Sequence, residues 1–141
     1  MRKHIANLCK CFVAVLLVLA MADFAEAGAL ALKVTKVSLG GVSDGKQPIV
    51  IEYTVRNTSG VEYFSRLNYI VLEITGDIGN GRKETYQRKV DINYHFNPVL
   101  GPGRSKSLRT RFSRSVNPSR GWYRYKGIRV KILKYNARRA S

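Results

Sequence analysis

The sequence predicts an all-β fold, an antiparallel β-sandwich of about six or seven strands. Three observations lead to this class. Apolar and polar residues alternate in several short stretches, and no stretch of residues 28–135 repeats apolar residues every three or four positions, as a helix would. Gly, Pro, Asn and Asp separate these stretches at even spacing. Residues 28–141 have the length of one domain.

Residues 1–27 are expected to form a cleavable secretory signal peptide. Basic residues precede an unbroken apolar run over residues 11–22, and the small residues Ala25 and Ala27 follow it. The run is short for a membrane span, which needs about 20 residues. We therefore expect an exported protein, periplasmic or extracellular, and not a transmembrane one.

Cleavage after Ala27 would remove every Cys and Met and leave His95 as the one histidine. A Cys nucleophile and a Cys/His zinc site are thereby excluded from the exported portion. Asp91, Asn93 and His95 alternate along one stretch, but with a single carboxylate they are interpreted as a strand edge, not a metal site. We expect no catalytic residue, metal or cofactor, and no enzymatic activity.

The first two strands are expected over residues 29–39 and 48–57. In the first, the apolar phase slips after Val34, as a bulge would cause. In the second, alternation is clear, and its inward residues are Ile49, Ile51, Tyr53 and Val55.

Residues 67–75 alternate less sharply, which is typical of a strand in mid-sheet. The sequence GDIGNG over residues 76–81 predicts a hairpin turn at Asn80-Gly81. It lacks the alternating carboxylates and closing Glu of a calcium loop. Residues 83–92 are expected to return as the partner strand.

The C-terminal half is expected to contain a loop at 97–103, a strand at 107–113, a turn at 117–121 and a last strand. In that strand Tyr123 and Tyr125 share one phase and Ile128 begins another, so a bulge is expected at Lys126-Gly127. The domain is expected to span residues 28–135, with a basic tail at 136–141.

The layout resembles small bacterial immunoglobulin-like envelope domains, within the broader fibronectin type III-like sandwiches. The FxLYD-type family is the nearest group, although residues 72–77 read LEITGD and its signature is absent. The likeness rests on the V-x-N-x-S turn at residues 55–59 and on Pro102-Gly103 before the strand that carries Phe112. It implies an immunoglobulin-like β-sandwich and a binding or accessory role, with no catalytic residue.

Charge is the strongest functional signal. The net charge is +16, and residues 92–141 hold thirteen Lys and Arg and no Asp or Glu. Such a field attracts anionic partners and weakens with salt. The candidate anion-binding residues are Arg109, Arg111, Arg124, Lys126, Arg129, Lys131 and Lys134.

The aromatic residues beside these cations have two possible roles. Trp122 and the nearby tyrosines could stack on bases or sugars, but the favoured interpretation is that they fill the edge of the core. In a sandwich, Arg109 and Arg111 should lie on one outer face, and Arg129 and Lys131 on the other.

The sequence therefore favours a non-enzymatic envelope module that engages an envelope protein or an anionic surface such as lipid phosphate or acidic glycan. The alternative is a dedicated polyanion-binding protein, for lipopolysaccharide phosphate, acidic glycan or DNA; nucleic acid is possible but not favoured.

Overall fold

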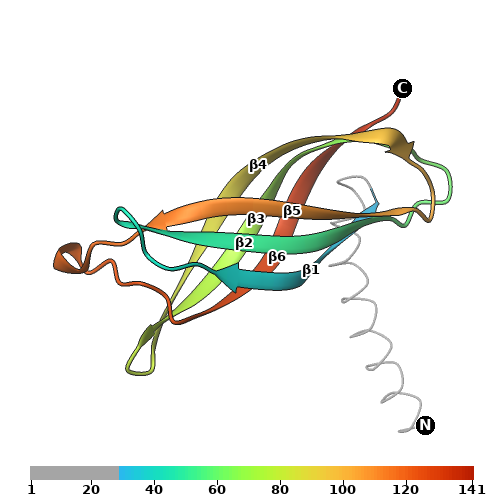
Figure 1. Ribbon diagram of the computed structural model, residues 1–141. Coiled ribbons are helices and arrows are strands. Elements are labelled where there is room, and N and C mark those ends of the chain that lie inside the picture. The colour runs from blue at the N-terminus through green and yellow to red at the C-terminus, as the bar shows by residue number, and fades with distance from the viewer. Residues whose placement is uncertain (1–28) are drawn as a thin grey trace, which may run out of the picture.

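Two three-stranded antiparallel sheets pack face to face in the computed structural model, which describes residues 29–141 (Figure 1). One sheet has the order β1-β2-β5 and the other the order β4-β3-β6. The predicted all-β class and the two-layer antiparallel architecture are confirmed. The expected signal peptide lies outside the described residues. The strands are β1 (Leu30–Leu39), β2 (Lys46–Asn57), β3 (Phe64–Gly79), β4 (Arg82–Leu100), β5 (Ser105–Ser115) and β6 (Gly127–Arg139).

The core lies between the central strands of the two sheets. The four predicted inward residues of β2 are fully buried, as are Ile70, Leu72 and Ile74 of β3. Both are the central strands of their sheets, so their backbones are hydrogen-bonded on both edges. Their inward side chains are covered by the opposite sheet. Alternation in the sequence thus identifies the interior correctly.

One predicted bulge and one predicted hairpin turn are confirmed. The register of β1 against β2 shifts between Val34 and Lys36. The β3–β4 hairpin turns at Asn80 and Gly81, both with positive φ, which is the conformation of a two-residue type I′ turn.

The last strand differs from its expected form. Residues 122–126 lie outside any strand, β6 begins at Gly127, and the bulge falls at Leu133 instead of Lys126-Gly127. The strand also continues to Arg139, because residues 136–139 pair with the first part of β3. The loop expected from Asn97 starts later, since β4 continues to Leu100.

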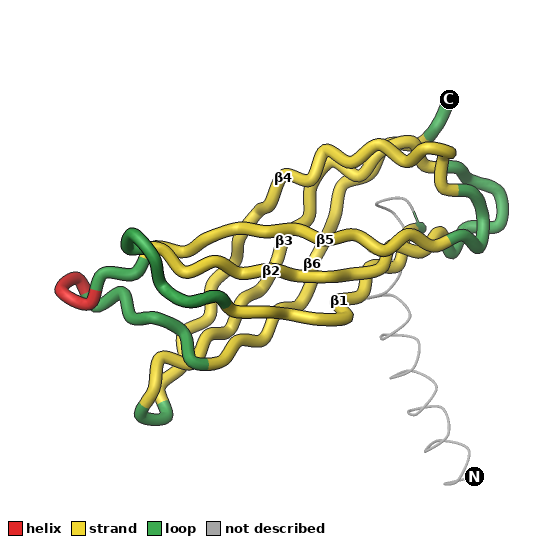
Figure 2. Tube along the Cα trace, in the orientation of Figure 1, coloured by secondary structure: helices red, strands yellow, loops and turns green. Residues whose placement is uncertain are grey.

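The two ends of the sandwich differ in what they carry. The β5–β6 connection, with a short 3-10 helix η1 (Pro118–Arg120), lies at one end. The β4–β5 turn and the C-terminus lie at the other (Figure 2). β5 has 11 residues, so it separates the two ends by roughly 33 Å.

Candidate functional site

Arg109 and Arg111 lie on the outer face of the β1-β2-β5 sheet, as predicted. Both are exposed, and they alternate with the inward residues Leu108 and Phe112. In the strand register, Arg109 of β5 lies opposite Glu52 of β2, and Lys36 of β1 lies opposite Glu52 on its other side. The carboxylate of this cross-strand row therefore has a cation on each neighbouring strand.

Arg129, Lys131 and Lys134 lie on the outer face of the other sheet. They are exposed, and their partners on β3 are Thr75, Glu73 and Val71. The bulge at Leu133 restores the phase, which keeps Lys134 on the same face as Lys131. The two sheets thus carry their cations on opposite sides of the molecule.

Arg124 and Lys126 belong to neither face. They are exposed residues of the connection before β6, which is fixed to β3 by the bond from the Lys126 amide to the Asp77 carbonyl, 2.8 Å. The seven predicted cations therefore fall into three places, and the fold brings no single groove together from them.

The interpretation that the C-terminal aromatics fill the core edge is wrong for two of them. Trp122 is 45% exposed and Tyr123 is 37% exposed. Each has a guanidinium over its ring, Arg120 at 5.4 Å from Trp122 and Arg82 at 5.6 Å from Tyr123. Residues 122–126 form a connection and not a strand, so alternation does not decide which of their side chains are buried.

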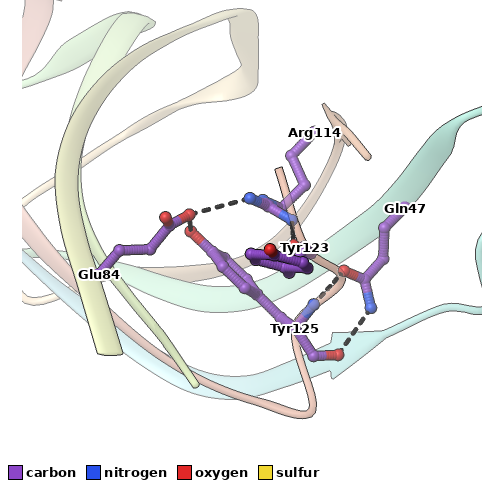
Figure 3. A network of polar contacts seen from close by, with 5 residues as sticks. All are labelled: Gln47, Glu84, Arg114, Tyr123 and Tyr125. Atoms are coloured by element: carbon purple, nitrogen blue, oxygen red, sulfur yellow. Dashed lines mark hydrogen bonds and ion pairs between the residues drawn. The ribbon is translucent and has the colours of Figure 1, made fainter. Parts of the chain in front are cut away.

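Tyr125 is buried, as expected, and it is the centre of a polar network (Figure 3). Its hydroxyl donates to Glu84 Oε1 at 2.5 Å, and Arg114 Nη2 donates to the same oxygen at 2.9 Å. The Arg114 guanidinium also lies 3.7 Å from the Tyr125 ring centroid. Burial first, and then the bond to Glu84, raises the pKa of Tyr125, so the phenol keeps its proton at a pH where a free tyrosine would lose it.

Gln47 completes this network from β2. Its side-chain oxygen accepts from the Tyr125 amide at 2.8 Å, and its Nε2 donates to the Tyr125 carbonyl at 2.9 Å. Gln47 is itself 3% exposed. Residues from β2, β4 and β5 therefore hold the connection that leads into β6, and we assign the network to anchoring.

A cavity of about 610 Å³ opens at the other end, between the edge strands β4 and β5. Side-chain contacts join these strands near the network, through Glu84–Arg114 and through the bond from Arg88 to the Ser113 carbonyl. The cavity lies at the β4–β5 turn, whose residues Gly101 and Pro102 line it. Its side chains include Tyr63, Tyr94, Phe96, Val99, Arg104 and Lys106.

The cavity was not predicted from the sequence. Arg104 and Lys106 are in the basic half of the chain, but their place beside Tyr63 depends on how the β2–β3 loop meets the β4–β5 turn. The alternation of Tyr94 and Phe96 was the available signal, since both continue the inward phase of β4 past Ile92.

No group of three His, Cys, Asp or Glu side chains within residues 29–141 is close enough to hold a metal ion. His95 is exposed on β4, and Asn93 Oδ1 accepts a bond from Arg66 at 2.8 Å. Across the same residues, no helix has both the length and the apolar character needed to span a membrane.

Comparison with known proteins found no match among family models, curated proteins or solved structures.

Proposed function

We propose that the protein is a non-enzymatic binding module of the cell envelope, exported by its N-terminal leader, that attaches to an anionic surface through widely distributed charge. The observation that carries the proposal is the placement of Arg109 and Arg111 on one outer face and of Arg129 and Lys131 on the opposite one. Cations spread in this way attract an extended anion from many orientations.

Ion pairing inside the protein leaves this field largely intact. Two ion pairs form among residues 29–141, Arg114–Glu84 and Arg139–Glu62. The same residues have a net charge of +15, because the +16 of the whole chain includes three cations and two carboxylates before residue 28. Most of this charge therefore faces solvent and is open to counterions or to an anionic partner.

We further assign the domain to the immunoglobulin-like sandwiches. In those domains one sheet has the order A-B-E and the other contains C′-C-F. The orders β1-β2-β5 and β4-β3-β6 correspond to them strand by strand. This connectivity supports the fold that the resemblance implies.

A second candidate function, dedicated polyanion binding, is favoured by one observation. The exposed rings of Trp122 and Tyr123 lie among Arg82, Arg120 and Arg124 at one end of the sandwich. Such a cluster could stack on bases or sugars while its cations bind phosphate or sulfate. This function would place the binding energy at one end, whereas distributed attachment places it on both faces.

Salt-gradient elution from an immobilised polyanion such as heparin tests the two candidates. Three double variants are compared: Arg109→Gln/Arg111→Gln, Arg129→Gln/Lys131→Gln and Arg120→Gln/Arg124→Gln. Distributed attachment predicts that each variant elutes slightly earlier and that all three shifts are similar, because each removes two of many cations.

If the Arg120/Arg124 variant alone loses most of its retention, a dedicated site at that end replaces the proposal. If the wild-type protein is not retained even at low salt, both candidates are rejected.

A further inference from the structure

The cavity between β4 and β5 has the features of a built small-ligand site. Its volume of about 610 Å³ falls in the range typical of such sites, about 300–1,000 Å³. It lies along the edge formed by β4 and β5, at the end away from the contacts Glu84–Arg114 and Arg88–Ser113. The end of β4, the β4–β5 turn and the start of β5 all contribute to its wall.

The walls of the cavity combine aromatic faces with positive charge. Tyr63 is 51% exposed, and Tyr94 and Phe96 pack edge to face with their ring centroids 5.3 Å apart. Arg104 and Lys106 supply the cations, and no Asp or Glu is among the residues that line the cavity. The positive charge at this site is therefore not opposed by a lining carboxylate.

A buried residue, Asn57, fixes the rim. Asn57 is fully buried, and its Nδ2 donates to the Glu62 carbonyl at 2.7 Å and to the Leu100 carbonyl at 3.0 Å. Its backbone amide donates to the Arg104 carbonyl at 2.9 Å. The segments that carry Tyr63 and Val99 are thus held by the Asn57 side chain and the Arg104 segment by its backbone, so one residue holds the cavity in shape without a ligand.

Packing around Tyr63 adds to this order. A Cβ on Gly101 would lie 3.0 Å from Tyr63 Cε1, so the ring lies directly against the β4–β5 turn. The Ala140 amide donates to the Tyr63 carbonyl at 2.8 Å, which ties the same residue to the end of the chain. The exposed ring is therefore held in a defined place at the mouth of the cavity.

We propose that this cavity binds a short acidic saccharide, with one sugar ring packed on Tyr63 and Tyr94 and a carboxylate on Arg104 and Lys106. Tyrosine rings offer an apolar face together with a hydroxyl, which suits a sugar, and a guanidinium binds a carboxylate with two parallel hydrogen bonds. The inference rests on the proposed function, because it names the chemical class of anion that the module holds most selectively.

NMR titration of the purified protein with two matched disaccharides tests the site. Cellobiouronic acid carries one carboxylate, and cellobiose is its neutral counterpart. We expect the acidic sugar to shift amide signals of residues 94–106 and to bind at least about tenfold more tightly than cellobiose, since it alone engages both cations. Hexyl phosphate is the third probe, and tighter binding of it than of the acidic sugar would overturn the saccharide assignment.

Matched variants separate the cavity from general charge. Lys106→Gln and Tyr63→Ser should each weaken binding of the acidic disaccharide by about fivefold or more. Lys83→Gln and Tyr69→Ser remove the same groups at positions outside the cavity and outside the other proposed sites, and should leave binding of the disaccharide unchanged. Equal weakening by Lys106→Gln and Lys83→Gln would overturn the proposal, because it would mean that net charge alone matters.

The two proposals fail differently. If the heparin column retains the wild-type protein but the acidic disaccharide shifts no cavity signal, the cavity proposal is rejected and distributed attachment stands. If the disaccharide binds in the cavity but the wild-type protein is not retained on heparin, distributed attachment is rejected and the cavity proposal stands.

Discussion

At the scale of single residues, Gly76 and Tyr125 depend on each other. A Cβ on Gly76 would lie 2.2 Å from the Tyr125 ring, and that ring is held in place by Glu84 at its hydroxyl and by Gln47 at its backbone. A glycine in the middle of a strand weakens it unless something packs over the bare backbone. The Tyr125 ring supplies that cover.

Gly76→Ala should therefore destabilise the protein by about 1–3 kcal/mol, because the added methyl group forces a fixed ring to move. Gly41→Ala is the matched control, since nothing lies within 4 Å of its added Cβ. Urea unfolding of both variants measures the difference. Equal stability of the two variants would mean that Tyr125 can move freely.

Tyr125 also gives a pH dependence of known sign. Its pKa is raised in the folded protein by burial and by the bond to Glu84, whereas the unfolded side chain ionises near its usual value of about 10. Stability from Tyr125 is therefore fully present below pH 10. It is lost as the pH rises above that value, because the unfolded side chain then releases its proton and the free energy of the unfolded state falls relative to that of the folded state.

Compared with Tyr125→Phe, the wild-type protein should lose about 1.4 kcal/mol of stability per pH unit above about pH 10. Urea unfolding of both proteins between about pH 8 and pH 11 measures this difference. If the difference between their free energies of unfolding stays constant across this range, the buried position of the phenol is contradicted.

At the scale of elements, sequence alternation was most reliable where a strand is flanked on both sides. β2 and the central part of β3 were predicted correctly because their inward residues meet the opposite sheet along the whole strand. The hairpin at Asn80-Gly81 was also predicted, since this residue pair adopts the required positive φ at low cost. Local chemistry was sufficient in both cases.

Residues 122–126 could not be assigned in this way. Tyr123 and Tyr125 alternate like strand residues, but tertiary contacts with Gln47 and Asp77 decide their conformation. The cavity is a similar case, because its rim joins two loops through Asn57. In both cases the contacting residues are distant in the sequence, so local patterns cannot reveal them.

Gln47→Ala should release this connection. It leaves the Tyr125 amide and carbonyl without the partners they have in the folded protein, and each unsatisfied buried group costs about 1–3 kcal/mol. Gln87→Ala, at an exposed position of β4, is the control and should be neutral. Hydrogen exchange should accelerate at residues 122–126 in the Gln47 variant alone; unchanged exchange there would argue against an anchoring role.

At the scale of the whole molecule, charge and topology act together. The basic half of the chain supplies both β5 and β6, and the fold assigns these strands to different sheets. The prediction that their cations lie on opposite faces followed from sandwich topology and is confirmed. The exposure of Trp122 and the cavity at the far end were found only in the assembled fold.

Backbone amide NMR during titration with a sulfated polysaccharide tests the central claim most directly. Distributed attachment predicts gradual shifts along both β5 and β6, on opposite faces, and their joint reversal as salt is added. Shifts confined to one face, or to residues 120–126 at the Trp122 end, would contradict it.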